Sequence, residues 1–166
     1  MENPLIPLIQ SEFETRIIRE SVPRIKKCME HAGEDRLDWR PNPATNPIGN
    51  LVLHLCGNMT QYIHSTLGEN EDHRYRSAEF EATGPFSISE LNDLLDRSAS
   101  QSWKVMQHIS DAELLKTYRV QCFDLSGYEI VSHVIEHFSY HTGQIALLTK
   151  IICEKDLGFY KDLKLD

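Results

Sequence analysis

Three histidines recur at intervals of four residues in the C-terminal third of the chain, at His133, His137 and His141. Each step of four residues turns an α-helix by roughly 400°, so neighbouring histidines would lie about 40° apart on one face. Imidazoles on consecutive turns can bind the same divalent metal ion. The spacing therefore predicts metal chemistry on a helix.

The helix face that carries these histidines is apolar. With His137 as the reference direction, Ile130 and Leu148 lie at about +20°. The imidazoles are thus expected to point inward, where a ring without a hydrogen-bonding partner costs roughly 1–3 kcal/mol. For His137 and His141, a shared metal ion is the favoured interpretation. The role of His133 stays open between a further ligand, a partner of a ligand and a substrate-binding group.

A second apolar segment contains His54. Residues 51–55 are apolar almost all round apart from this histidine, which is typical of a buried helix. An interior histidine taken alone is more often a hydrogen-bonded core residue than a ligand, but a metal site needs a ligand from a second helix. Asn58 and Gln61 share the face of His54, and they are expected to accept a ring N–H or to bridge helices. The other histidines are expected in solvent: His31, His64, His73 and His108.

Four long segments have the apolar period of helices and must position these groups. Their expected bounds are residues 4–31, 46–67, 87–108 and 126–153. Residues 118–125 alternate weakly and predict a short strand or hairpin before the last helix, whereas the acidic residues 69–84 predict an exposed connection. The chain, residues 1–166, is interpreted as a single domain. Helices of this length favour an all-α four-helix bundle.

Several helix ends carry local signals. The expected N-caps are Asn3, Asn46, Ser87 and Ser126. The last two begin capping boxes that Glu90 and Glu129 complete. Pro23 is expected to kink the first helix or to split it in two.

Composition excludes several classes of function. The 166 residues include 17 Lys or Arg and 25 Asp or Glu, giving a formal charge of −8, which disfavours binding to nucleic-acid phosphates. No run approaches the roughly 18 apolar residues of a membrane span, and no signal peptide is expected. The scattered cysteines predict neither disulfides nor a thiolate zinc site. We therefore expect a cytoplasmic protein.

The histidine-bearing segments resemble the DinB/YfiT-like superfamily of metal-dependent four-helix-bundle proteins. The resemblance rests on His-Leu-Cys-Gly-Asn-Met-Thr-Gln at residues 54–61 and on H-x3-H-x3-H-T-G-Q-I at residues 133–145. The lead-in Trp-Arg-Pro-Asn-Pro-Ala-Thr-Asn at residues 39–46 is similar to an uncharacterised branch of that superfamily.

The resemblance implies a bundle with up-down-down-up connectivity and a metal site between the second and fourth helices. The ligand positions of the superfamily correspond to His54, His137 and His141, and its typical metal is zinc or nickel. Many members are homodimers. Related enzymes are transferases and isomerases that use low-molecular-weight thiols such as bacillithiol or mycothiol.

Three neutral imidazoles would leave a divalent ion with at least one open position. Such an ion lowers the pKa of bound water towards ~7 or binds a thiol as thiolate. Two functions follow: a metal-dependent enzyme acting on a small molecule, as a thiol-dependent S-transferase or a hydrolase, and a non-catalytic metal-binding bundle. No catalytic residue is assigned, because Glu136 lies about 100° from the ligand face. The expected ring partners or substrate-binding groups are His133, Asn58, Gln61 and Gln144.

Overall fold

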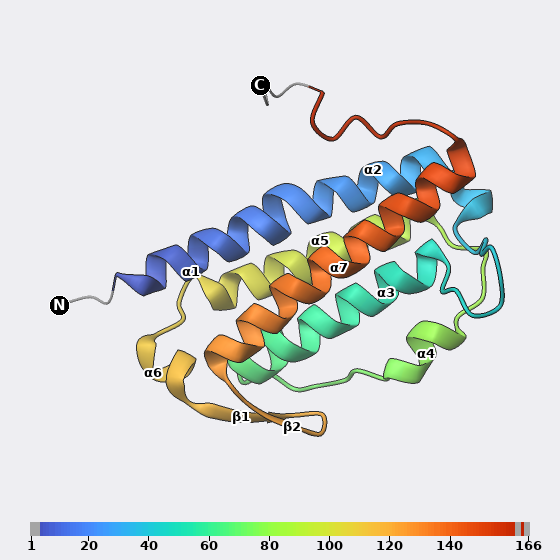
Figure 1. The fold of residues 1–166 in the computed structure, drawn as a ribbon. Coiled ribbons are helices and arrows are strands. Elements are labelled where there is room, and N and C mark those ends of the chain that lie inside the picture. Colours follow the sequence, from blue (N-terminus) through green and yellow to red (C-terminus); the bar gives the residue numbers. More distant parts are fainter. Residues whose placement is uncertain (1–3, 162–163, 165–166) are drawn as a thin grey trace.

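The computed structural model describes residues 4–161 and residue 164 and shows a mostly helical protein (Figure 1). The first long helical segment comprises α1 (Leu5–Phe13), η1 (Glu14–Ser21) and α2 (Val22–Ala32). The second comprises α3 (Ile48–Met59) and η3 (Thr60–Leu67). The third is α5 (Ile88–Met106), and the fourth is α7 (Gly127–Cys153). The shorter elements are η2 (Glu34–Arg36), α4 (Arg76–Glu81), α6 (Asp111–Leu115), β1 (Thr117–Val120) and β2 (Phe123–Ser126).

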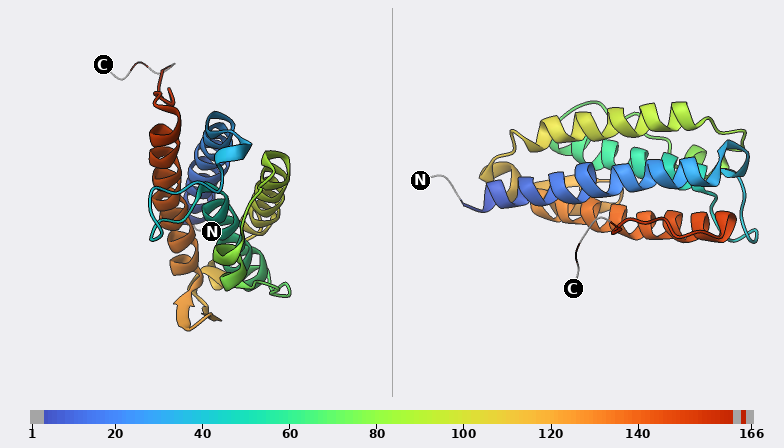
Figure 2. Two further views of the ribbon diagram at one scale, coloured as in Figure 1. Left: turned by 90° about the vertical axis from the view of Figure 1, so that its right-hand side faces the viewer. Right: turned by 90° about the horizontal axis from the view of Figure 1, so that it is seen from above.

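The four long segments pack side by side around one apolar core (Figure 2). Helix α7 packs against α2 and α3, and α5 packs against the same two helices. Phe13, Met59 and Phe138, from three of the segments, are fully buried. Among the residues that the structure describes, no helix is long and apolar enough to span a bilayer.

The predicted capping signals have mixed outcomes. Ser126 and Glu129 form a reciprocal capping box at the start of α7, as predicted, and Ser87 accepts a hydrogen bond from the backbone of Glu90. The prediction for Asn46 is wrong, because Pro47 has the extended ψ of 163° and the helix begins only after it. The expected cap Asn3 lies outside the described residues.

Pro23 does not split the first long segment, which stays helical from Leu5 to Ala32. The π-helical stretch η1 directly precedes it, and the backbone N–H of Val22 bonds to Ile17 O, five residues earlier. Proline lacks an N–H, and its ring collides with the carbonyl four residues before it in a regular α-helix. The widened turns of η1 lie where that collision would occur. Of the two alternatives for Pro23, a kink or a split, the split does not occur, and the helix is irregular at this π-helical stretch instead.

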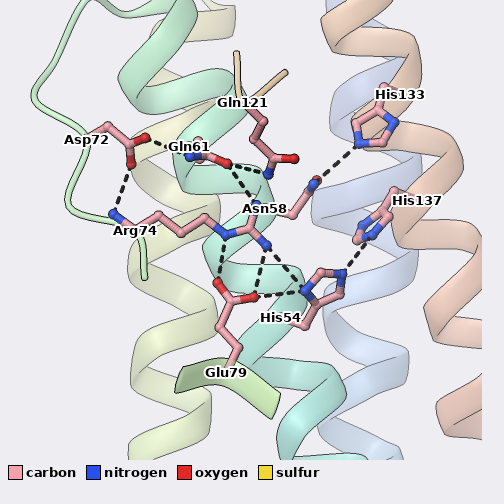
Figure 3. Close-up of polar contacts among 9 residues, drawn as sticks. All are labelled: His54, Asn58, Gln61, Asp72, Arg74, Glu79, Gln121, His133 and His137. Carbon is pink, nitrogen blue, oxygen red and sulfur yellow. Dashed lines mark hydrogen bonds and ion pairs between the residues drawn. The ribbon is translucent and has the colours of Figure 1, made fainter. Parts of the chain in front are cut away.

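The predicted hairpin is present between α6 and α7. Strands β1 and β2 are antiparallel, with Thr117 opposite Ser126 and Val120 opposite Phe123. The two residues between the strands form the turn, and Gln121 adopts a left-handed φ of 54°. The hairpin thereby holds Gln121 beside Gln61, at the start of η3 (Figure 3).

The connection between η3 and α5, residues 68–87, is called the crossover here. The predicted exposed connection over residues 69–84 is confirmed for most of its residues, but the prediction misses α4, which packs on α3. Asn50 donates from Nδ2 to the carbonyl oxygens of Glu79 and Ala82, at 2.9 and 2.8 Å. These bonds fasten the end of α4 to α3 and place Glu79 inside the protein, only 9% exposed.

Candidate metal centre

Three histidines from two helices converge at the interface between α3 and α7. His54 lies on α3, and His137 and His141 lie on α7. One ligand atom of each lies within 4.8 Å of those of the other two. The Nε2 atoms of His54 and His137 point at each other, 3.0 Å apart (Figure 3). The structure thus brings together the three residues that the sequence singled out.

The arrangement fits a divalent ion. Ligand nitrogens at roughly 2.0–2.1 Å from a tetrahedral zinc ion lie about 3.3 Å apart, close to the observed separation of the His54 and His137 nitrogens. The other ring nitrogen of His137, Nδ1, is buried without a hydrogen-bonding partner among the described residues. The polar contact of the His137 ring is therefore the one between its Nε2 and Nε2 of His54. A cation between these two nitrogens could bind a lone pair of each.

The orientation of His141 is fixed by Gln144. Its Nδ1 lies 2.7 Å from Oε1 of Gln144, one helical turn later on α7. Since the amide oxygen only accepts, Nδ1 carries the proton and Nε2 keeps its lone pair. Of the two roles expected for Gln144, the structure supports that of a ring partner, which fixes the tautomer and direction of a ligand.

The partner of His54 comes from α4. Its Nδ1 lies 2.8 Å from Oε2 of Glu79. Arg74 holds the same carboxylate with two parallel hydrogen bonds, from Nε to Oε1 at 2.7 Å and from Nη2 to Oε2 at 2.9 Å (Figure 3). The side chains of Arg74 and Glu79 are only 4% and 10% exposed. The ring of Phe80 packs on His54, with centroids 4.6 Å apart. A buried ion pair and an aromatic ring therefore position this imidazole.

Gly57 makes room for the ion pair. A Cβ at this position would collide with the Glu79 carboxylate and would lie 3.1 Å from Nε of Arg74. Glycine inside a helix costs roughly 1 kcal/mol relative to alanine, so the residue marks a close approach. This glycine is the feature of the sequence that could have indicated a segment packed on this face of α3, although no prediction was drawn from it.

Of the two roles left open for Gln61, the hydrogen bonds favour bridging over a ring partner, although the bridged segments are the crossover and the hairpin rather than two helices. Its Oε1 accepts from Nη1 of Arg74 at 2.9 Å and from Nε2 of Gln121 at 2.8 Å. Its Nε2 donates to Asp72 at 2.7 Å. Gln61 therefore positions Arg74, and through it Glu79, rather than a ligand ring.

Asn58 contacts His133 and not a member of the triad. Its Nδ2 lies 3.3 Å from Nε2 of His133, and Tyr62 stacks on that ring at a centroid distance of 4.6 Å. The ring of His133 lies 5.4 Å from that of His137. His133 thus lies beside the triad with its Nε2 occupied by Asn58, as a ring partner or substrate-binding group would.

The electrostatics favour the protonation states that metal binding needs. Burial, reinforced by His141 and His54, lowers the pKa of His137 to about 3. Burial also lowers the pKa values of His133 and His141. For Glu79, burial opposes ionisation, but the hydrogen bonds from Arg74 and His54 outweigh it and hold the pKa below its ordinary value. At neutral pH, His137 and His141 are therefore uncharged and Glu79 is ionised.

The other histidines lie away from the triad. His31, His73 and His108 are exposed, as predicted. His64 is half-buried, and its Nδ1 is buried without a partner among the described residues, so its expected exposure is wrong. The residue lies inside η3, which packs on α5.

Comparison with known proteins identifies the relationship. A family model described as a protein of unknown function (DUF1572) matches residues 11–161. The structure is similar to the crystal structure of a DinB-like protein, YjoA, from Bacillus subtilis, with a TM-score of 0.67 and 15% sequence identity. The match covers 92% of this chain and 97% of that one. No curated protein matches the chain. The likeness confirms the resemblance to DinB-like proteins at the level of the fold.

Proposed function

We propose that this chain, which belongs to the family described as a protein of unknown function (DUF1572) and has a DinB-like fold, binds one divalent metal ion. The proposed ligands are His54, His137 and His141. The observation that carries the proposal is the convergence of these imidazoles from two helices, with Glu79 and Gln144 orienting two of them. Zinc or nickel suits a site of imidazole donors.

We place this site in a four-helix bundle with up-down-down-up connectivity. The length of the crossover supports that connectivity, because a chain that starts two successive helices at the same end must first return along the bundle. In Figure 1 the crossover runs along α3 before α5 begins. This return path also delivers Arg74 and Glu79 to His54.

An enzymatic role fits the arrangement better than a closed structural site. A divalent ion with three imidazole ligands keeps an open position at which it can lower the pKa of a bound water or thiol. His133 would close that position as a fourth ligand, but its Nε2 is bound by Asn58. His133 is instead placed to contact a small-molecule substrate. We therefore propose a thiol-dependent S-transferase or a small-molecule hydrolase.

Metal analysis combined with an activity panel tests the proposal. We expect the purified protein to carry about one zinc or nickel ion per chain, as a mononuclear site requires. Low-molecular-weight thiols with an electrophile, and separately ester and amide substrates, are then assayed with and without the metal. Turnover that needs the metal supports the enzyme. Full metal content without turnover on any substrate supports the alternative of a non-catalytic metal-binding bundle, whereas a protein that binds no metal contradicts both.

A homodimer is the assembly that we propose for the chain. A groove of about 1410 Å³ lies between α1 and α7, and Leu8 and Tyr140 on its walls are 64% and 61% exposed. Exposed apolar side chains of this size favour contact with another protein surface.

The four free cysteines fit a reducing, cytoplasmic setting.

Leu8→Glu tests the dimer. We expect light scattering to give a dimer mass for the unmodified chain and a monomer mass for the variant, because the carboxylate would have to be buried in the interface. Metal content should not change, since Leu8 lies outside the triad. A monomeric unmodified chain would contradict the proposed assembly.

A further inference from the structure

A pocket between α3–η3, α5 and the crossover is called the side pocket here. Its volume is about 510 Å³, within the range of about 300–1,000 Å³ that is typical of small-molecule sites. Helix α7, which carries two of the three converging histidines, contributes no lining residue to it among those that the structure describes. Its walls include three apolar and three polar side chains: Leu53, Cys56, Leu94, Thr60, His64 and Gln101. The side pocket is therefore a site of its own, apart from the triad.

The ion pair of the crossover separates the side pocket from the triad. Arg74 and Glu79 both contact the ring of His54, and both also line the side pocket. In Figure 3 this ion pair lies on the opposite side of His54 from His137. Thr60, which lines the side pocket, follows His54 by six residues and is turned about 120° from it around the helix. A molecule in the side pocket would thus contact the ion pair without contacting a proposed metal ligand.

Polar side chains without partners lie in the walls of the side pocket. Among the described residues, the side chains of Thr60, His64 and Gln101 have no hydrogen-bonding partner. Nδ1 of His64 is also buried, and buried polar atoms in proteins nearly always have a partner. A hydroxyl, an imidazole and a carboxamide can each donate and accept hydrogen bonds. A ligand with a polar group would supply the partners that the protein itself does not.

The charges around the side pocket favour an uncharged ligand. Its acidic lining residues are Glu71, Asp72 and Glu79, and Arg74 is the only lysine or arginine among the described residues that line it. Hydrogen bonds to Glu79 and Gln61 already hold that guanidinium, so an anion would meet carboxylates without a free cation. A buried ammonium would lose its water without gaining a counter-ion, because Arg74 already neutralises Glu79. Both signs of charge are therefore disfavoured inside the pocket.

We propose that the side pocket binds an uncharged small molecule with an apolar body, such as an aromatic ring, and a carboxamide or hydroxyl group. The apolar body packs between Leu53 and Leu94, and the polar group forms hydrogen bonds with Thr60 and Gln101. Because no proposed metal ligand lines the side pocket, this binding needs no metal ion. The inference is thus independent of the proposed metal site.

NMR titration of the ¹⁵N-labelled full chain tests the proposal. Benzamide is the uncharged probe, and benzoate and benzylamine are its charged counterparts of similar size. We expect benzamide to shift the backbone signals of residues 53–60, 71–79 and 94–101 with a dissociation constant of about 1 mM or lower, the range that a fragment of this size reaches. Benzoate and benzylamine should bind at least about tenfold more weakly.

The titration is run with and without added zinc, and the affinity for benzamide should be the same in both. Three results would overturn the inference: no saturable shift of these signals by benzamide, a charged counterpart that binds as tightly as benzamide, or benzamide binding that requires zinc. Failure of the chain to bind zinc would refute the proposed metal site and leave the benzamide result as the test of the side pocket.

Two variants locate the probe. Gln101→Leu keeps the volume of the side chain but removes its hydrogen-bonding groups, so it should weaken benzamide binding by about fivefold. Ala78→Trp places an indole in the side pocket from an exposed position of α4 and should abolish the binding. Circular dichroism checks that the helices of both variants persist.

Gln107→Leu is the matched control, because Gln107 is exposed at the end of the same helix, α5, and lies outside the side pocket. It should bind benzamide as the unmodified chain does. Unchanged affinity in Ala78→Trp would refute the site, and unchanged affinity in Gln101→Leu would refute the polar contact. An equal loss in Gln107→Leu would show that the effect of Gln101→Leu is not specific to the side pocket and would overturn that contact too.

Discussion

Replacing His137 and His141 together with alanine is expected to abolish metal binding. Metal content should fall from about one ion per chain to near zero, because a single imidazole, His54, would remain of the three that converge. Loss of the hydrogen-bonding partner of one metal ligand typically lowers metal affinity about 10–100-fold, so loss of two ligands should lower it by more than about 100-fold. Elemental analysis of the purified variant and zinc competition with a chelator measure the two quantities.

Single variants show whether the loss is specific. His133→Ala should keep its metal, since Asn58 occupies Nε2 of His133, and the exposed His31 should be replaceable without effect. Circular dichroism of each variant checks that the helices persist. Full metal content in the double variant would refute the site. Loss of metal in His133→Ala would identify a fourth ligand and favour the non-catalytic bundle.

The parts of this site that the sequence predicts depend on short-range patterns. His137 and His141 share one face because they lie four residues apart on the same helix, whatever the rest of the chain does. The start of α7 is equally local, since Ser126 and Glu129 satisfy each other's backbone groups within one turn. Gln144 lies one turn after His141, and its Oε1 is 2.7 Å from Nδ1 of that ring.

The parts that the sequence does not predict depend on where a distant segment packs. The apolar residues around His54 predict its burial, which the structure confirms, but they suggest ring partners on the same helix, at Asn58 and Gln61. The partner is Glu79, 25 residues away, within a stretch whose acidic composition resembles an exposed loop. Composition alone cannot distinguish a solvated carboxylate from one that an arginine neutralises inside the protein.

The buried ion pair is the part of the centre with the largest energetic consequences. Arg74 and Glu79 are both almost fully covered, and each depends on the other for its charge to be tolerated. Removal of one member of a buried pair leaves an uncompensated charge, which costs much more than the pair itself contributes. Removal of both members leaves no such charge.

Arg74→Met is therefore expected to destabilise the metal-free protein by about 3–5 kcal/mol, measured by urea unfolding at neutral pH. The double variant Arg74→Met with Glu79→Met should recover most of that loss, because two apolar side chains of similar length can fill the space beside Gly57 without a buried charge. This double variant should still bind zinc more weakly than the unmodified chain, since His54 has lost the carboxylate that orients it.

An exposed ion pair provides the control for this comparison. Lys26 and Asp96 join α2 to α5, and their side chains are 28% and 56% exposed. Lys26→Met should cost no more than about 1 kcal/mol, because water solvates the carboxylate that remains. Equal losses in Lys26→Met and Arg74→Met would contradict the burial argument. If the double variant is as unstable as Arg74→Met alone, the ion pair itself is needed for the fold. If the double variant binds zinc as tightly as the unmodified chain, Glu79 does not orient His54.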